Sequence, residues 1–244
     1  MPDFLCIGAQ KAGTSWLHRV LAQHPGLGFP GGKEVHYWDW VESGRKPPDL
    51  EGYRRLFSGQ PERRLGDMTP AYATLREETV RTLLAAFPGV RVLFVLRNPI
   101  ERAWSAARMF YGWSQLEPDE ATDEWFLPLL QSRGSVSRGD YEMTLRRWQP
   151  HMRPGQLLIL HYEDLLGDPA QSVRQVCDHI GVDAASLPEG SERALRARVR
   201  EGPPRELTPF LRKELDRIYR PRIVSLQRYL GRDLGHWLDS PGRT

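Results

Sequence analysis

The chain has 244 residues, of which 34 are lysine or arginine and 31 are aspartate or glutamate, leaving a formal net charge of +3. This length suffices for one α/β domain with a sizeable core, and the mild basicity fits an anionic small ligand as well as nucleic acid. The two cysteines, Cys6 and Cys177, lie in apolar patterns that are typical of core residues. Their number and spacing exclude a disulfide framework and a CxxC metal site. No apolar run is long enough to span a membrane and no leader pattern precedes the first strand, so we expect a cytoplasmic protein without a membrane span.

The first predicted unit is a strand, a tight loop and a helix, within the sequence FLCIGAQKAGTSWL at residues 4–17. The N–H groups of such a loop and of the helix start converge on one point, which predicts a phosphate cradle. Gly8 and Gly13 have the spacing of a Walker A loop, but Thr14 stands where an NTPase has lysine, and the lysine lies inside the loop as Lys11. A lysine there can neutralise a leaving group, although an ordinary glycine-rich βα turn is the alternative.

The rest of the chain alternates strands with helices. Residues 90–96 are apolar almost throughout, as expected for the centre of a parallel sheet. Asn98 is a good N-cap and Pro99 a good first helical residue, while residues 45–52 are polar and proline-rich and are expected to form a surface loop. The expected strands lie at residues 4–7, 27–29, 64–67, 90–96 and 156–160, and the expected helices at 14–24, 77–87, 99–109, 141–149, 169–180 and 208–230. This alternation predicts an α/β fold with a mostly parallel sheet, in which ligands bind at the carboxyl ends of the strands.

A second motif, RNPIERAWS, follows the apolar strand at residues 97–105. A Walker B strand ends in an aspartate that holds magnesium, whereas this strand ends at the cation Arg97. An arginine at this place is suited to bind a phosphate directly through bidentate hydrogen bonds. Ser105, two turns into the following helix, is able to reach another anion. The alternatives are a surface ion pair of Arg97 with Glu101 and an ordinary helix serine.

Taken together, the two motifs resemble those of the sulfotransferases that use 3′-phosphoadenosine-5′-phosphosulfate (PAPS). The matching pieces are QKAGTSWL at residues 10–17 and LRNPIERAWS at residues 96–105, and KEVHYWD at residues 33–39 is similar to the base-carrying segment of the heparan-sulfate, glycan-type branch. Because the agreement covers nearly the whole chain in order, the chain is identified as a bacterial member of this family. The resemblance implies a P-loop-NTPase-like three-layer fold, with a central, mostly parallel five-stranded sheet flanked by helices, in a single sulfotransferase domain over residues 1–244.

The resemblance also implies roles for individual residues. Lys11 would contact the sulfuryl group and the bridging oxygen of the leaving phosphate. Glu34 would take the proton of the acceptor, with His36 as its orienter or as the alternative base. Nine residues are implied to bind the donor nucleotide: Gly13, Thr14, Ser15, Trp16, Arg97, Ser105, Tyr141, Arg198 and Arg200. The last three lie outside the two phosphate motifs.

The chain departs from the family pattern in two places. Met68 stands where glycan-type members usually have lysine, which puts an acceptor or bridging contact in doubt. The basic, glycine-containing loop that closes over the nucleotide is best matched by residues 196–202, for which a solvated basic helix end is the alternative. Outside the family comparison, the pair Lys33–Glu34 also reads as a solvated charge pair, and His36 as a structural histidine.

We therefore expect an enzyme that moves a sulfuryl group from PAPS to an acceptor hydroxyl, or less readily an amine, and releases 3′-phosphoadenosine-5′-phosphate (PAP) without a metal. The acceptor class is a saccharide, a lipid or a secondary metabolite, and no nucleic-acid partner is expected, because no RNA-binding aromatic motif or basic stripe is present. One alternative is a P-loop nucleotide kinase or NTPase, and another is a non-catalytic module that binds PAP or nucleic acid on the same fold.

Overall fold

The computed structural model describes residues 1–117, 119–188 and 203–239. The chain divides into two compact units, one made of Met1–Leu96 with Arg146–Val199 and the other of Arg97–Leu145 with Arg200–Thr244. Each unit is described separately below. A single sulfotransferase domain over the whole chain stays a prediction.

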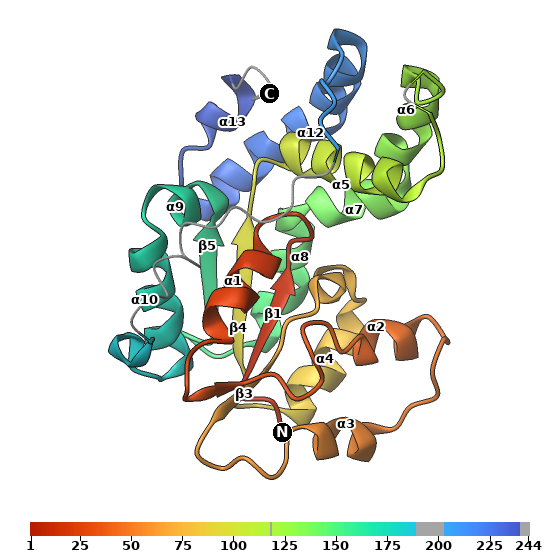
Figure 1. Ribbon diagram of the computed structural model, residues 1–244. Helices are drawn as coiled ribbons and strands as arrows, with labels where there is room; N and C mark the ends of the chain where they lie inside the picture. Colours follow the sequence, from red (N-terminus) through yellow and green to blue (C-terminus); the bar gives the residue numbers. More distant parts are fainter. Residues whose placement is uncertain (118, 189–202, 240–244) are drawn as a thin grey trace. The chain divides into compact units, whose positions relative to one another are not determined.

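The first unit is built on a five-stranded sheet whose strands all run parallel (Figure 1). The strand order is β2-β3-β1-β4-β5, which brings β1 between β3 and β4 at the centre. All five residues of β1 are buried, as are the last five of the six in β4, because helices cover both faces of a parallel sheet. The strands are β1 (Phe4–Gly8), β2 (Leu27–Gly28), β3 (Arg64–Asp67), β4 (Arg91–Leu96) and β5 (Leu157–His161). The predicted parallel α/β sheet is confirmed.

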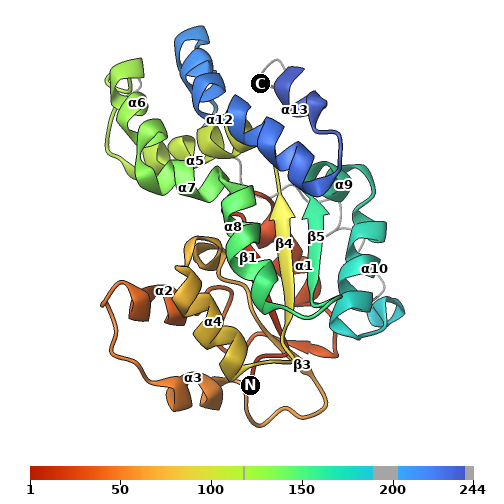
Figure 2. The same cartoon turned by 180° about the vertical axis from the view of Figure 1, so that it is seen from behind.

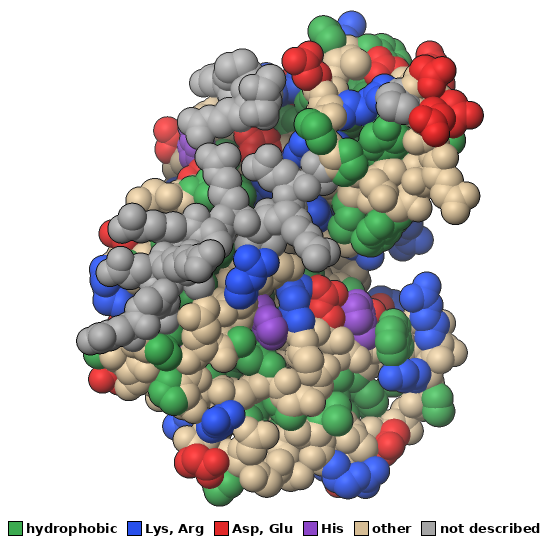
Figure 3. All heavy atoms as spheres, viewed as in Figure 1, with side chains coloured by type: hydrophobic (Ala, Val, Ile, Leu, Met, Phe, Trp, Pro, Cys, Tyr) green, Lys and Arg blue, Asp and Glu red, His purple; other side chains and the backbone are tan. Residues whose placement is uncertain are grey.

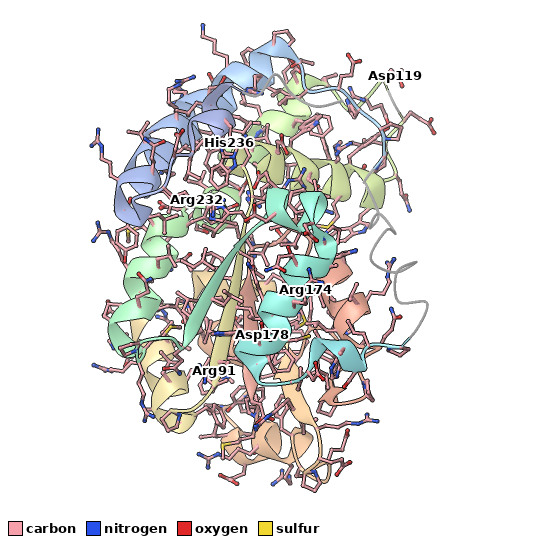
Figure 4. All side chains as sticks on the ribbon, turned by 90° about the vertical axis from the view of Figure 1, so that its left-hand side faces the viewer. Arg91, Asp119, Arg174, Asp178, Arg232 and His236 are labelled. Carbon is pink, nitrogen blue, oxygen red and sulfur yellow. The ribbon has the colours of Figure 1, made fainter. Side chains whose placement is uncertain are left out.

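Helices complete the layers of this unit. Figures 1 and 2 show α1 (Thr14–Leu21) on one face of the sheet and α4 (Glu77–Ala86) on the opposite face. Beside β5 lies α10 (Pro169–Ile180), on which Figure 4 labels Arg174 and Asp178. The shorter elements are α2 (Tyr37–Glu42), α3 (Leu50–Leu56), α9 (Tyr162–Gly167), η1 (Pro70–Thr74), η2 (Gln149–His151) and η3 (Ala184–Ser186). The remaining helix, α8 (Tyr141–Trp148), has residues in both units.

Local expectations differ from the structure at several places, and the helix expected at residues 99–109 continues to Trp113. The expected loop at residues 45–52 ends early, because Asp49 caps α3 by accepting a hydrogen bond from the Gly52 N–H at 2.8 Å. Such a short helix has too few turns to produce a periodic apolar pattern. The first helix was expected to reach residue 24 but ends at Leu21, three residues earlier.

The second unit is helical, with α5 (Pro99–Trp113), α6 (Asp123–Gln131), α7 (Arg133–Gly139), α12 (Pro209–Leu230) and α13 (Gly235–Asp239). Asn98 caps α5 as predicted, since its side chain accepts from the Ile100 N–H at 3.0 Å and also donates to the Trp237 carbonyl at 2.9 Å. The long helix α12 ends at Gly231, whose φ of 60° is the left-handed conformation expected at a helix C-terminus.

The close approach of β3 to β1 gives a test of the sheet. Gly66 pairs with Phe4 in the ladder, and a Cβ on Gly66 would overlap the Phe4 ring. Gly66→Ala should therefore lower the free energy of unfolding by about 1–3 kcal/mol, the usual cost of overpacking a core. Chemical denaturation measures this, with Gly89→Ala as the matched control because a Cβ there meets nothing within 4 Å. Equal stability of the two variants would contradict this packing.

Candidate functional site

The predicted phosphate cradle corresponds to the loop between β1 and α1. Lys11 lies in the loop with a φ of 67°, and Gly13 follows as the N-cap of α1 with a φ of 86°. The Leu17 N–H donates to the Gly13 carbonyl at 3.0 Å, which starts the helical ladder. The N–H groups before this point have no intrahelical acceptor, and the helix dipole favours an anion beside them. The loop is therefore suited to an anion, and its binding of the donor phosphate stays a prediction.

Glycine is required at position 13 for two reasons. Its backbone lies in the left-handed region, and a Cβ would come within 3.2 Å of the Tyr162 ring. Of the other predicted cradle residues, Thr14 and Trp16 are buried and Ser15 is exposed. Of these three residues, Ser15 is therefore the one whose side chain is accessible to a ligand.

The predicted base segment forms a chain of charged contacts. Lys33 Nζ contacts Glu34 Oε1, and Glu34 Oε2 lies 3.1 Å from His36 Nε2. On its other side, His36 Nδ1 lies 2.8 Å from Asp39 Oδ2. The histidine therefore bridges two carboxylates, and a protonated ring can donate to both. Figure 3 shows histidine, acidic and basic side chains next to one another on the face drawn there, in keeping with these contacts.

The ring of His36 is also fixed by stacking. It lies parallel to the Trp40 ring, with centroids 5.2 Å apart and an interplanar angle of 10°. Lys46 Nζ lies over the same indole, 4.2 Å from its centroid. The backbone of His36 is in the left-handed region with a φ of 55°, just before α2 begins. The imidazole is thus held in one orientation by its hydrogen bonds and by the helix that follows.

Next to this segment lies a buried carboxylate, Asp67, at the end of β3. Three hydroxyls lie within hydrogen-bond distance of it: Thr69 at 2.6 Å, Tyr72 at 2.8 Å and Tyr53 at 3.0 Å. Burial raises the pKa of Asp67, while the bonds from Thr69, Tyr72 and Tyr53 lower it in part. An ionised carboxylate can only accept hydrogen bonds, so each of the three hydroxyls must donate its proton to Asp67.

This direction determines how the base segment is held. Because the Thr69 and Tyr72 hydroxyls donate to Asp67, their oxygens remain available as acceptors. Thr69 Oγ1 accepts from the N–H of Val35 at 3.0 Å and of His36 at 3.3 Å. Tyr72 Oη accepts from the Tyr37 N–H at 3.1 Å. Asp67 therefore anchors the backbone next to Glu34 through hydroxyls that it orients.

The sequence missed these supporting residues. Asp39 lies in the segment that resembles the family's base region, but only the structure shows that it pairs with His36. The residues DMTPAY at 67–72 held a signal, since an acid and two hydroxyl residues follow a strand end. Met68, the departure from the family pattern, is fully buried, and its N–H donates to the Lys33 carbonyl at 3.1 Å. Its side chain is a core residue.

The predicted Arg/Ser motif lies in the second unit. Arg97 Nη2 lies 3.3 Å from Glu101 Oε2, so the ion pair considered from the sequence is present. Ser105 is buried in α5. The Tyr141 hydroxyl donates to the Arg97 carbonyl at 2.7 Å, and burial raises the pKa of this tyrosine. Tyr141 therefore supports the backbone of Arg97, and these two predicted residues are in contact.

Arg198 and Arg200 lie outside the described residues. Over residues 1–117, 119–188 and 203–239, no set of three or more His, Cys, Asp and Glu side chains is placed to hold a metal ion. In the same residues, no helix combines the length and the apolar composition that crossing a bilayer requires.

The anchoring role of Asp67 can be tested by Asp67→Asn. An amide nitrogen cannot accept from the buried hydroxyls, so the free energy of unfolding at neutral pH should fall by about 1–3 kcal/mol. Amide hydrogen exchange at Val35, His36 and Tyr37 should become faster, because their acceptors lose their fixed direction. Asp178→Asn, at an exposed position on α10, is the control (Figure 4). Unchanged exchange at all three amides would contradict the anchoring role.

The pH dependence of stability gives a second readout of the same group. Because burial raises the pKa of Asp67, the folded state holds this proton to higher pH than the unfolded chain does. Its contribution to stability is therefore greatest below the unfolded pKa and falls as the pH rises through the folded pKa. Denaturant titrations across this acidic range should show a fall in the free energy of unfolding with rising pH that is present in the parent protein and absent from Asp67→Asn. The same slope in both proteins would assign it to other groups.

Comparison with known proteins identifies the family. The profile of the sulfotransferase domain matches residues 1–215. The chain is 26% identical over 196 residues to human bifunctional heparan sulfate N-deacetylase/N-sulfotransferase 2, across 75% of this chain and 22% of that protein. It is 30% identical over 190 residues to mouse heparan sulfate glucosamine 3-O-sulfotransferase 3A1, across 75% of this chain and 46% of that protein. The chain thus spans less than half the length of both relatives.

A solved structure agrees over nearly the full length. The sulfotransferase from Alicyclobacillus acidocaldarius superposes with a TM-score of 0.74 at 28% identity, covering 97% of this chain and 98% of that one. This confirms the predicted P-loop-like fold around the parallel sheet. The match of the domain profile covers the cradle, the base segment and the Arg/Ser motif. The chain belongs to the sulfotransferase domain family, whose members are enzymes that transfer sulfuryl groups.

Proposed function

We propose that this protein transfers a sulfuryl group from PAPS to a hydroxyl of a glycan or small-molecule acceptor and releases PAP. The observation that carries the proposal is that the base segment is bonded to the end of β3, the neighbour of β1 in the sheet, because the Met68 N–H donates to the Lys33 carbonyl at 3.1 Å. Burial raises the pKa of Cys6 in β1 to about 12, and among the smaller effects Lys33 lowers it while Glu34 raises it. For His18 in α1, burial and then Lys33 lower the pKa, and Glu34 raises it. The charges of Lys33 and Glu34 therefore act on both elements that form the cradle.

The chemistry follows from these neighbours. In-line sulfuryl transfer needs a positioned acceptor, charge neutralisation at the leaving oxygen and a route for the acceptor proton. Lys11 and the N–H groups at the start of α1 supply positive charge for the leaving 5′-phosphate. Glu34 takes the hydroxyl proton as the acceptor oxygen attacks sulfur, and His36, bonded to Glu34 and Asp39, holds the carboxylate in place. Arg97 and Ser105 bind the 3′-phosphate.

The acceptor class is supported by the relatives. One relative is a heparan sulfate 3-O-sulfotransferase and another carries an N-sulfotransferase activity on the same glycan, by their names. The 3-O-sulfotransferase has the higher identity of the two, 30% against 26%. A carbohydrate hydroxyl is therefore the first acceptor to test, with an amine as the second.

The kinase or NTPase alternative has less support. Thr14 occupies the place of the Walker A lysine, and the residue after β4 is Arg97 instead of an acid. The carboxylate at the end of β3, Asp67, is fully buried and surrounded by three hydroxyls. A magnesium-dependent site would need an accessible acid at such a strand end. Binding of PAP against ATP with Mg²⁺, measured by calorimetry, distinguishes the alternatives, and tighter binding of ATP would favour the NTPase.

The role of Lys11 is tested by Lys11→Ala. Sulfuryl transfer, followed by the mass shift of acceptors from a glycan and small-molecule library, should fall by about 10²-fold or more, as when a transition-state donor is removed. The fold should persist, because Lys11 lies in a half-exposed loop. Lys213→Ala, at an exposed position in α12, is the matched control and should keep full activity. Full activity of Lys11→Ala would exclude the proposed mechanism.

The role of Glu34 is tested separately by Glu34→Gln. Loss of a general base should lower kcat by roughly 10²–10⁴-fold while PAP affinity stays near that of the parent. Glu51→Gln, an exposed change in α3, serves as the control. If Glu34→Gln retains kcat and His36→Ala loses it, the histidine is the base instead.

A further inference from the structure

A buried arginine in the second unit, Arg102, has no acidic partner among the residues that the structure describes. It is fully buried in α5, three residues before Ser105. Its Nη2 lies 2.9 Å from the Ser135 carbonyl and 3.4 Å from both the Ser135 and Tyr219 hydroxyls. Its Nε and Nη1 have no hydrogen-bond partner within the described residues. All of its partners there are neutral.

This arrangement is costly for the protein alone. An arginine keeps its charge in proteins, so it cannot escape burial by losing a proton. A buried charge is destabilising unless an opposite charge and hydrogen bonds compensate it. Two guanidinium nitrogens without a partner therefore point to a compensating anion that the described part of the chain does not supply.

The surroundings of Arg102 indicate where this anion binds. Arg97 forms an ion pair with Glu101, so the charges of these two side chains cancel. The three side chains of Arg97, Glu101 and Arg102 together therefore carry one net positive charge. Both arginines act on one hydroxyl: although burial raises the pKa of Tyr141, the charges of Arg102 and then Arg97 lower it in part. The two guanidinium groups are therefore within electrostatic reach of the same buried tyrosine.

The neighbouring packing keeps Arg102 in this position. Its partner Tyr219, from α12, is fully buried and also donates to the Ser135 carbonyl at 3.1 Å. A Cβ on Gly139 would lie within 3.1 Å of Tyr219 Cζ and 3.2 Å of Pro99 Cβ, so α7, α12 and the start of α5 meet here. The packing thus fixes Arg102 near the N-terminal end of α5, which begins two residues after Arg97.

We propose that Arg102 supplies the uncompensated positive charge of the subsite for the donor's 3′-phosphate, as a positioning residue behind the direct ligands Arg97 and Ser105. This inference rests on the proposed function, because it takes PAPS as the donor. A phosphate dianion balances the excess charge of the group, and the low dielectric around Arg102 strengthens their attraction. Arg102 thus adds selectivity for nucleotides that carry a 3′-phosphate.

The test compares PAP with adenosine 5′-phosphate, which lacks the 3′-phosphate, by calorimetry on the full chain. Arg102→Met should weaken PAP binding by roughly ten-fold to a hundred-fold and leave the affinity for adenosine 5′-phosphate within about two-fold. The affinity of Arg102→Lys, which keeps the charge, should lie between the parent and Arg102→Met. Arg217→Met, an exposed change in α12 of the same unit, should bind both nucleotides as the parent does.

Thermal unfolding without ligand separates a binding role from a structural one. The removed charge is uncompensated, so Arg102→Met should unfold close to the temperature of the parent, while its stabilisation by PAP should be much smaller. An equal loss for both nucleotides, or failure of both Arg102 variants to fold, would show a structural role and overturn the inference. Unchanged PAP affinity would also overturn it. If the parent does not prefer PAP to adenosine 5′-phosphate, the proposed donor itself is wrong.

Discussion

The geometry of the base segment depends on one buried carboxylate. Asp67 is fully buried at the end of β3, where its negative charge is compensated only by hydroxyls among the contacts described. Since these hydroxyls must donate to it, Thr69 and Tyr72 present their oxygens to the N–H groups of residues 35–37. A single charge thereby converts rotatable hydroxyls into fixed acceptors. The position of Glu34 and His36 relative to the sheet follows from that constraint.

The cradle and the base segment meet because both follow strands of the same parallel sheet. β1 leads into the loop that carries Lys11, and its neighbour β3 ends in Asp67, which holds the base segment. In parallel sheets the carboxyl ends of neighbouring strands lie at one edge, so the loop with Lys11 and the segment held by Asp67 become neighbours. The fold thus supplies the juxtaposition that sulfuryl transfer from a phosphate requires.

Charge balance distinguishes the two units. In the first, Glu34 contacts the cation Lys33 through one oxygen and lies 3.1 Å from His36 Nε2 through the other. In the second, Arg97 is balanced by Glu101 while Arg102 is not balanced by any acid within the part of the chain that the structure describes. A carboxylate held in place by neighbouring side chains suits proton transfer, and an arginine without an acidic partner suits anion binding. This contrast supports different roles for the two motifs.

The sequence alone determined the parallel α/β architecture, the loop with Lys11 and the cap of α5 by Asn98, because each depends on local spacing and on the conformational preferences of glycine, asparagine and proline. It also placed Glu34 and His36 in one segment. Only the tertiary structure decided that His36 bridges Glu34 and Asp39, that Asp67 orients Thr69 and Tyr72, and that Arg102 is buried without an acid. Hydrogen-bond direction and charge balance depend on which side chains from distant segments become neighbours, and local sequence spacing carries no record of that.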